Sequence, residues 1–328
     1  MKKRIALIYG GASEEHNVSL MGYEYVSELL KANGYDVISV YIDRDGRWSC
    51  NGATVFPFPC DVGVLKEACG NTISVDAAIP LLHGDGGESG EIQGLLSAAK
   101  IPFVGSDAST GAVCLDKHYT KCIAKNLGVP VVDWICFPKN VTPYEALYMC
   151  ENTLRFPVFI KPRRLGSSIG AFVAKGREEF LEYFPKAYSV GSGLIMAESL
   201  VENKRELECA YYGTSEKTVI SPPGEILTDG FYGYDEKYVK SAKIEAVANV
   251  NEDIRDTAKQ YSRALAKICG LRHLGRIDFF LTDGRLVFNE INTFPGFTSQ
   301  SLYPKMLNAM GIPPKEALRS FIEDAIGC

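Results

Sequence analysis

The chain of 328 residues lacks the features that mark membrane, nucleic-acid-binding and disulfide-rich proteins. No apolar run approaches the roughly 18 to 20 residues that a membrane span needs. Lysine and arginine (35) are outnumbered by aspartate and glutamate (40), whereas a nucleic-acid surface normally carries a basic excess. The ten cysteines include no pair separated by only two residues, which disfavours zinc and thioredoxin-type motifs. We therefore expect reduced thiols in a cytoplasmic protein without nucleic-acid or membrane partners.

Apolar segments and helical patterns alternate through the first hundred residues. Strands are predicted at 4–9, 37–42, 76–82 and 102–104, and helices at 18–30 and 93–99. This order predicts a parallel sheet with helical cover, in which ligands bind at the carboxyl ends of the strands. Gly10-Gly11 and His83-Gly84 fall at such ends.

Two residues near these strand ends are candidate ligand contacts. Glu15 could hold a substrate ammonium group, or it could simply favour the dipole of the helix that follows. His83 is either a structural or a catalytic histidine, and its position leaves both interpretations open. A dinucleotide site with Asp43 as the ribose ligand is disfavoured, because the motif Gly-x-Gly-x-x-Gly is absent.

A phosphate clamp is predicted in the middle of the chain. Lys161 ends an apolar strand at 157–162, and the loop Gly166-Ser167-Ser168-Ile169-Gly170 that follows offers backbone N–H groups and hydroxyls to phosphate oxygens. Lys117, at the start of a helix predicted over 116–127, is a second candidate cation. The loop is not a Walker A motif, because it lacks Gly-Lys-Ser/Thr. The alternatives are an ordinary hairpin turn and solvated surface lysines.

The remaining elements suggest three regions, at 1–110, 111–195 and 196–328. Strands are predicted at 194–198, 206–212, 276–281 and 286–292, and a helix at 252–269. Segment 228–243 is aromatic, charged and broken by glycine, which is typical of a functional loop.

Oxygen-bearing side chains alternate along the last two predicted strands. Side chains two residues apart share one face of a strand, so Arg276 lies beside Asp278, and Glu290 lies beside Asn292. Two carboxylates and an amide oxygen on one patch suit Mg²⁺, which prefers hard oxygen ligands. The alternative is a solvated hairpin face. An arginine beside these carboxylates favours the functional interpretation, because it could bind an anionic ligand.

The length of the hairpin loop decides whether these residues meet. A three-residue loop at 283–285 would place Asp278 opposite Glu290, and Phe280 would then face Phe288. A two-residue loop would instead put Glu290 on the face away from Asp278. We predict the three-residue loop.

Taken in order, these motifs resemble the D-alanine–D-alanine ligase family from residue 4 to about residue 304. The motifs that carry the resemblance are Gly10-Gly11-x-Ser13-x-Glu15-x-x-Val18-Ser19, Leu82-His83-Gly84 with Gly87-Glu88, Asp116-Lys117, Lys161-Pro162 with the glycine–serine loop, segment 231–238, Gly275-Arg276-Ile277-Asp278, Asn289-Glu290-Ile291-Asn292-Thr293 and Pro295-Gly296-Phe297-Thr298-Ser299. The resemblance implies an ATP-grasp fold of α/β and α+β type. Its Rossmann-like N-terminal domain (1–110) binds substrate, and the two subdomains that follow clamp ATP, the last of them carrying the 228–243 loop.

The resemblance also implies an activity and its residues. Family members join two D-alanines through D-alanyl phosphate for peptidoglycan precursors, with two Mg²⁺ (or Mn²⁺) ions, and are commonly homodimers. The implied metal ligands are Asp278, Glu290 and Asn292, and the implied ATP-binding residues are Lys117, Lys161, Ser168, Glu198, Val201, Glu206, Phe231 and Lys237. The implied catalytic residues are Glu15, Ser167, Tyr238, Arg276, Gly296 and Ser301, and the implied substrate contacts are Glu15, His83, Arg276, Gly296, Ser301 and Leu302.

Within the family, individual roles follow from matching positions. Arg276 and the Gly296 amide would stabilise an oxyanion, and Glu15 would take the ammonium of the first D-alanine. Tyr238 and Leu302 favour D-alanine as the second substrate, because D-lactate and D-serine relatives differ at these positions. A D-alanine–D-serine ligase is the alternative within the family, and a non-catalytic nucleotide-binding regulator is the alternative outside it.

Overall fold

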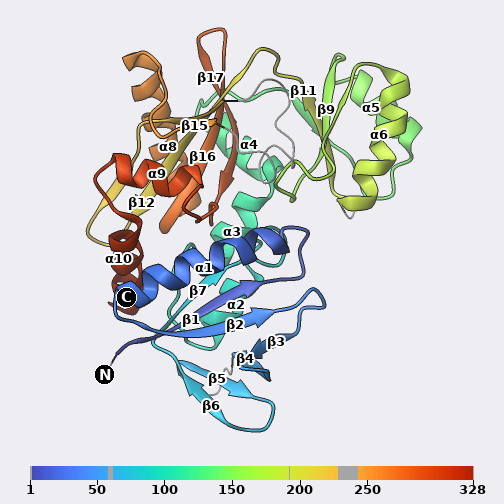
Figure 1. Cartoon of the computed structure of the whole chain (residues 1–328). Helices are drawn as coiled ribbons and strands as arrows, with labels where there is room; N and C mark the ends of the chain where they lie inside the picture. The colour runs from blue at the N-terminus through green and yellow to red at the C-terminus, as the bar shows by residue number, and fades with distance from the viewer. Residues whose placement is uncertain (1, 58–61, 192, 228–242, 328) are drawn as a thin grey trace.

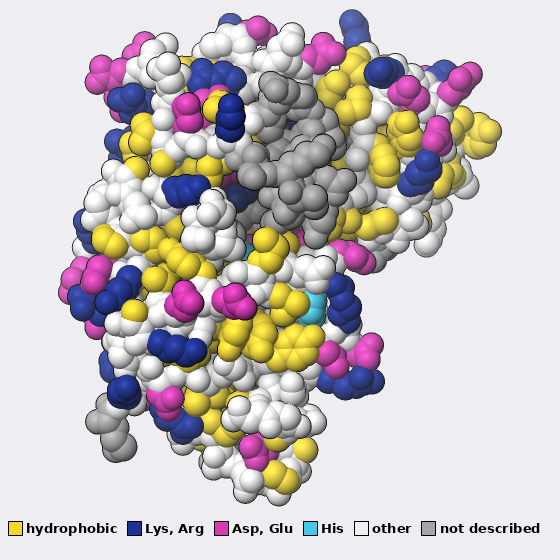
Figure 2. All heavy atoms as spheres, viewed as in Figure 1, with side chains coloured by type: hydrophobic (Ala, Val, Ile, Leu, Met, Phe, Trp, Pro, Cys, Tyr) yellow, Lys and Arg dark blue, Asp and Glu magenta, His cyan; other side chains and the backbone are white. Residues whose placement is uncertain are grey.

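The computed structural model describes residues 2–57, 62–191, 193–227 and 243–327, which form three β-sheets with helices packed on them. In Figure 1 the first sheet makes the lower lobe, the second lies at the upper right and the third at the upper left. On the face shown in Figure 2, basic and acidic side chains are interspersed without a broad basic area. No helix in the described ranges combines the length and the apolar character needed to cross a membrane.

The first sheet is parallel at one end and antiparallel at the other. Its order is β6-β5-β4-β3-β2-β1-β7, and β1 pairs in parallel with both β2 and β7, as predicted. The sequence does not predict the extension β3–β6, whose strands are three to five residues long. Segment 102–104, predicted as a strand, forms only one bridge, between Phe103 and Ala78. The elements are β1 (Arg4–Gly10), α1 (His16–Ala32), β2 (Asp36–Ile42), β3 (Trp48–Cys50), β4 (Ala53–Pro57), β5 (Val64–Glu67), β6 (Thr72–Ser74), β7 (Ala77–Leu81), α2 (Glu91–Ala98) and α3 (Ala108–Leu115).

The second sheet is antiparallel, with the order β10-β9-β11-β8. Helices α5 and α6 pack together, and a core of aromatic rings that includes Phe137, Phe180 and Phe184 lies between them and the sheet. Thr142 and Glu145 form a capping box that begins α5. The elements are β8 (Trp134–Cys136), α5 (Pro143–Glu151), β9 (Val158–Pro162), β10 (Phe172–Ala174), α6 (Arg177–Val190) and β11 (Ile195–Ser199).

The third sheet runs β15-β14-β12-β16-β17, with β13 paired to β12. Alternate residues of its strands enter two different cores: Cys209 and Ile277 pack with α8, whereas Ala210 and Leu274 pack with α9 and with the first sheet. The elements are α4 (Lys117–Asn126), β12 (Arg205–Gly213), β13 (Thr218–Ile220), β14 (Gly224–Leu227), β15 (Lys243–Glu245), α8 (Glu252–Cys269), β16 (His273–Thr282), β17 (Arg285–Asn292), α9 (Leu302–Ala309) and α10 (Pro314–Gly327).

The β16–β17 hairpin differs from the prediction in the length of its loop but not in the pairing of Asp278 with Glu290. Thr282 pairs with Arg285, so the loop has two residues and the predicted three-residue loop is wrong. A β-bulge then shifts the register, because Asn289 is an extra residue in β17 between Phe288 and Glu290. Asp278 therefore still lies opposite Glu290, as predicted.

The phenylalanine that pairs with Phe288 also differs from the predicted one. Phe279, not Phe280, pairs with Phe288, and both rings of that pair are buried in the core with centroids 6.1 Å apart. Phe280 points to the other face of the sheet and lines a cavity.

A buried histidine joins the first sheet to the C-terminal helix. The Gly105 amide donates to Nδ1 of His273 (2.9 Å), and Nε2 of the ring lies 3.1 Å from the Asp324 carboxylate on α10. Burial lowers the pKa of His273 to about 4, with Arg272 acting in the same direction, against the attraction of Asp324. The ring is therefore neutral in the folded protein near pH 7.

Acidification should destabilise the fold through His273. The unfolded chain protonates this imidazole near pH 6.5 and the folded chain only near pH 4, so stability that is present above pH 6.5 is lost as pH falls. A change from about pH 7.5 to about pH 5 should remove about 2 kcal/mol through this group. Urea unfolding at both pH values measures the loss, which should be smaller in His273→Asn, since Asn tolerates the positive φ of 62°. Equal losses in both proteins would contradict this role.

Candidate functional site

Two adjoining cavities lie between the three sheets. The first, of about 500 Å³, is lined mainly by the second and third sheets, and the second, of about 580 Å³, reaches the N-terminal region. The residues that line both are Lys117, Gly166, Ser167 and Glu290. A ligand that extends from one cavity into the other must therefore pass these polar groups.

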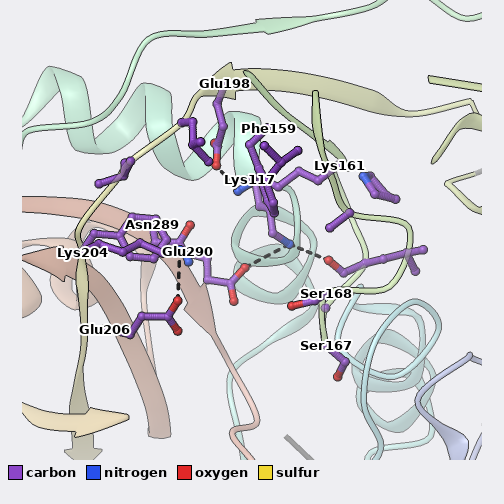
Figure 3. Close-up of a pocket in the computed structure, with 18 of the residues that line it drawn as sticks. Lys117, Phe159, Lys161, Ser167, Ser168, Glu198, Lys204, Glu206, Asn289 and Glu290 are labelled. Atoms are coloured by element: carbon purple, nitrogen blue, oxygen red, sulfur yellow. Dashed lines mark hydrogen bonds and ion pairs between the residues drawn. The ribbon is translucent and has the colours of Figure 1, made fainter. Parts of the chain in front are cut away.

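Lys117 stands at the junction of the cavities. Its Nζ donates to the Leu165 carbonyl (2.7 Å) and lies 3.1 Å from the Glu290 carboxylate, as Figure 3 shows. The preceding residue, Asp116, caps α4 and binds Arg163 through both carboxylate oxygens (3.1 and 2.8 Å). This ion pair fixes the start of the helix, and with it the position of Lys117.

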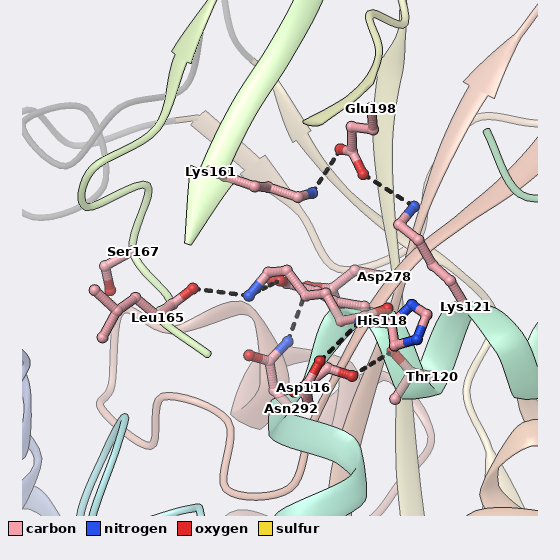
Figure 4. Close-up of polar contacts among 12 residues, drawn as sticks. Asp116, His118, Thr120, Lys121, Lys161, Leu165, Ser167, Glu198, Asp278 and Asn292 are labelled. Carbon is pink, nitrogen blue, oxygen red and sulfur yellow. Dashed lines mark hydrogen bonds and ion pairs between the residues drawn. The ribbon is translucent and has the colours of Figure 1, made fainter. Parts of the chain in front are cut away.

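Glu198 lies between two lysines at the upper part of the site in Figure 4. Lys161 Nζ is 2.5 Å from Oε1, and Lys121 Nζ is 3.2 Å from Oε2. Burial acts to raise the pKa of Glu198, but the two lysines outweigh it and hold that pKa at about 2. Burial lowers the pKa of Lys161 to about 8, with Lys121 and Lys117 acting in the same direction.

The first cavity also presents a flat ring and a carboxylate. Lys204 Nζ lies 3.9 Å from the centroid of the Phe280 ring and 3.1 Å from Glu206. Val201 lines the same cavity. An aromatic base with a hydroxylated sugar would find a stacking surface and a hydrogen-bond acceptor here.

The glycine–serine loop reaches across to the N-terminal region. Ser167 donates from Oγ to Glu15 Oε1 (2.5 Å), and Ser167 and Ser168 both have left-handed backbones, with φ of 53° and 58°. Such conformations are costly for residues other than glycine and concentrate at functional sites. Glu15 in turn needs Gly84 beside it: a Cβ there would lie 2.6 Å from the Glu15 carboxylate, and its φ is +72°.

Arg276 is surrounded by carboxylates. It donates to both oxygens of Asp278 (2.8 and 2.7 Å) and lies 3.2 Å from Glu208, while the Asn292 amide donates to Asp278 (3.0 Å). Burial acts to lower the pKa of Arg276, but Asp278 and Glu208 hold it well above its usual range. The permanent cation faces the second cavity, where it can meet a negative charge.

The three expected metal ligands form one cluster. Glu290 and Asn292 line the second cavity, and Asp278 lies directly behind them, since its carboxylate binds Arg276 and Asn292. Carboxylate and amide oxygens are hard ligands that suit Mg²⁺ and Mn²⁺ when phosphate oxygens and water complete the shell. The donor set therefore fits a divalent cation.

His83 and Glu88 form the N-terminal wall of the second cavity. Burial lowers the pKa of His83, so its imidazole is neutral near pH 7, although Glu15 acts in the opposite direction. Glu88 accepts hydrogen bonds from the Gly84 and Phe294 amides (3.1 and 3.0 Å). Burial and the charge of Glu15 raise the pKa of Glu88 to about 7. Through its two hydrogen bonds, Glu88 ties the N-terminal region to the chain that follows β17.

The start of α9 also lines the second cavity. Ser301 is the N-cap of this helix, and its hydroxyl is hydrogen-bonded to the Thr298 hydroxyl (2.8 Å). Leu302, the first helical residue, is buried. Gly296 lies beside them, since a Cβ at this position would be 3.2 Å from Ser301 Oγ. The N-terminus of a helix favours a carboxylate.

The structure thus brings most of the expected site residues together. Phe231, Lys237 and Tyr238 lie outside the described residues, so their predicted roles stay predictions. Lys121, Glu88 and Glu208 belong to the site but were not predicted. Two of them had a usable pattern: Lys121 is one helical turn after Lys117, and Glu208 is two residues after Glu206 on the same strand face.

Comparisons with known proteins give consistent matches along the chain. The family model described as "D-ala D-ala ligase N-terminus" matches residues 4–106, and that described as "D-ala D-ala ligase C-terminus" matches residues 123–323. The D-alanine–D-alanine ligase of Solibacter usitatus is 36% identical over 330 residues, which cover 99% of this chain and 96% of the relative. That of Oceanobacillus iheyensis is 33% identical, with 99% and 96% covered.

Solved structures match over the full length as well. D-alanyl-alanine synthetase A from Vibrio cholerae superposes with a TM-score of 0.89 at 30% identity, covering 100% of this chain and 99% of the other. The VanG D-Ala:D-Ser ligase from Enterococcus faecalis superposes with a TM-score of 0.88 at 31% identity, covering 99% and 100%.

The cluster on the hairpin predicts that Glu290→Ala weakens binding of Mn²⁺ at least about tenfold, because a charged oxygen ligand is lost. Electron paramagnetic resonance of Mn²⁺ with ADP present measures the affinity. Asp283→Asn is the matched control, since it removes a carboxylate from the loop of the same hairpin, away from the cavities. Equal affinity in Glu290→Ala and the wild type would exclude Glu290 as a ligand.

Proposed function

The chain belongs to the D-alanine–D-alanine ligase family, and we propose that it joins two D-alanines to D-alanyl-D-alanine with the conversion of ATP to ADP and phosphate. Its fold is that of the ATP-grasp ligases, as the sequence predicts. The ligases of this family serve peptidoglycan synthesis. We place the reaction in the cytoplasm, where ATP is available, and expect the homodimer that the family resemblance implies.

One observation carries the proposal: the two cavities meet at Lys117, Ser167 and Glu290. The first is lined by an aromatic ring, a carboxylate and lysines, one of which is Lys117 at the junction, which suits a nucleotide whose phosphates point toward the junction. The second holds Glu15 and Arg276, an anion and a cation suited to the two ends of an amino acid. The γ-phosphate of ATP and the carboxylate of D-alanine would therefore meet at the junction.

The first step needs positioning and charge neutralisation more than covalent help. Glu15 would bind the ammonium of the first D-alanine and leave its carboxylate at the junction. Lys117 and Lys161 would hold the phosphates as that carboxylate attacks the γ-phosphorus, which gives D-alanyl phosphate and ADP. Divalent ions at Asp278, Glu290 and Asn292 would neutralise further phosphate charge.

The second step is attack by the amine of the second D-alanine on the acyl carbon, with release of phosphate. Arg276 and the Gly296 amide would stabilise the oxyanion that forms. The start of α9, at Ser301 and Leu302, would hold the carboxylate of the incoming amino acid. Ser167, bound to Glu15, would keep the glycine–serine loop over the reacting groups.

D-Alanine–D-serine ligation is the alternative, and the similarity to the Enterococcus faecalis enzyme supports considering it. The apolar side chain of Leu302 at the wall of the second cavity favours D-alanine, because it offers a serine hydroxyl no partner. A regulator that only binds nucleotide is disfavoured, since it has no use for Arg276 beside the metal cluster.

A phosphate-release assay separates these functions. With ATP and Mg²⁺, D-alanine alone should drive release, and D-serine should not raise it further. Glu290→Ala should lower turnover about a hundredfold or more, because transition-state charge is no longer neutralised. Faster release when D-serine is added would favour the serine ligase. Nucleotide binding without any release would favour the regulator, and full activity of Glu290→Ala would remove the metal assignment.

A further inference from the structure

Lys121 has no part in the reaction described so far, although it is buried more deeply than the phosphate-binding lysines. It is 1% exposed, compared with 7% for Lys117 and 6% for Lys161. It follows Lys117 by one turn of α4, so both side chains leave the same face of the helix. Lys121 is not among the described residues that line the two cavities. A lysine buried away from the ligand needs an explanation, because burying its charge is costly unless it is paired.

The partner of Lys121 is a residue that does face the ligand. Glu198 lines the first cavity, and its carboxylate is shared: Lys161 holds Oε1 at 2.5 Å and Lys121 approaches Oε2 at 3.2 Å (Figure 4). The three groups together carry one net positive charge. One lysine is thus in excess of what Glu198 needs, and only Lys161 of the two lines the cavity.

When a nucleotide binds, Lys161 would contact a phosphate as well as Glu198. A phosphate bound by Lys161 competes with Glu198 for the same positive charge, so the contact between Lys161 and Glu198 weakens. A buried carboxylate that loses its only cationic partner is strongly destabilised. With Lys121 in place, Glu198 keeps a partner when Lys161 moves, so the exchange leaves no isolated charge.

We propose that Lys121 is a positioning residue that retains Glu198 as an ionised carboxylate and so releases Lys161 to a phosphate of the nucleotide. The inference rests on the proposed function only in taking ATP as the ligand. It assigns to Lys121 an effect on phosphate binding without contact with the phosphate.

The readout is the ratio of two dissociation constants, that of adenosine divided by that of ATP. Adenosine has no phosphate for Lys161 to bind, whereas ATP does. The ratio therefore isolates the contribution of the phosphates to binding. In Lys121→Met the ratio should fall at least about tenfold, because Lys161 stays on Glu198 or leaves a buried charge unpaired. Isothermal titration calorimetry on the full chain with Mg²⁺ present measures both constants.

A second substitution distinguishes this role from general damage. In the double variant Lys121→Met with Glu198→Gln, no carboxylate holds Lys161, so the ratio should return to that of Glu198→Gln alone. Structural damage at Lys121 would instead weaken adenosine and ATP together and would persist in the double variant. Lys121→Gln, which keeps a polar side chain, should lower the ratio in the same way and serves if the methionine variant does not fold. Lys125→Met, one turn further along α4 and next to Trp134, is the matched control and should leave the ratio unchanged.

The outcomes separate this inference from the proposed function. If wild-type protein binds ATP no more tightly than adenosine, the proposed function fails, and this inference fails with it. If the wild type prefers ATP and both Lys121 variants keep the same ratio, the role of Lys121 is overturned and the ligase proposal stands. A ratio that falls in Lys121→Met but is not restored by Glu198→Gln also overturns it.

Discussion

Asp278 and Glu290 face one another only because β17 contains one residue more than the regular ladder can pair. The two-residue loop alone would direct Glu290 to the core side of the sheet, where Ile277 and Phe279 are buried. The bulge at Asn289 reverses this, so that Glu290 and Asn292 share a face with Arg276 and Asp278. The cluster of expected metal ligands, the junction of the two cavities and the contact with Lys117 all follow from that reversal.

Most charged groups of the site are paired before any ligand is bound. Lys117 pairs with Glu290, Lys161 with Glu198, Lys204 with Glu206 and Arg276 with Asp278. Because each buried pair would be costly to break without replacement, a ligand must bring opposite charges of its own. A triphosphate with divalent cations would do this: phosphates would bind Lys117 and Lys161 while cations bind Asp278 and Glu290, and Lys121 would keep Glu198 paired. The resting site is therefore already complementary to such a ligand.

Much of the site was predictable because local rules determine it. Strand alternation brings Arg276 beside Asp278, and strand ends place Lys161 and His83 at the walls of the cavities. The Asp278–Glu290 pairing was predicted correctly with the wrong loop, since an error of one residue in the loop and an omitted bulge cancel. The sequence carries no comparable sign of the bulge. Phe280 was assigned to the wrong partner because of the loop length, since Phe280 and Phe288 lie between the loop and the bulge.

Residues that act through distant partners were beyond such rules. Glu88 accepts a hydrogen bond from Phe294, which is 206 positions away. Lys121 on α4 pairs with Glu198 on β11 of the second sheet. No periodicity within one strand or helix encodes these contacts, because they depend on how the sheets pack. The strands β3–β6, which are three to five residues long, were not predicted either.

We propose that carboxylates of two adjacent strands, brought to one face by a bulge, hold divalent cations against a triphosphate. A crystal structure with Mg²⁺ and a non-hydrolysable ATP analogue would locate both the cations and the phosphates. Metal density is expected about 2.1 Å from oxygens of Asp278, Glu290 and Asn292, with the phosphates between these residues and Lys161. Phosphates bound elsewhere, or a metal ion that contacts none of the three side chains, would contradict it.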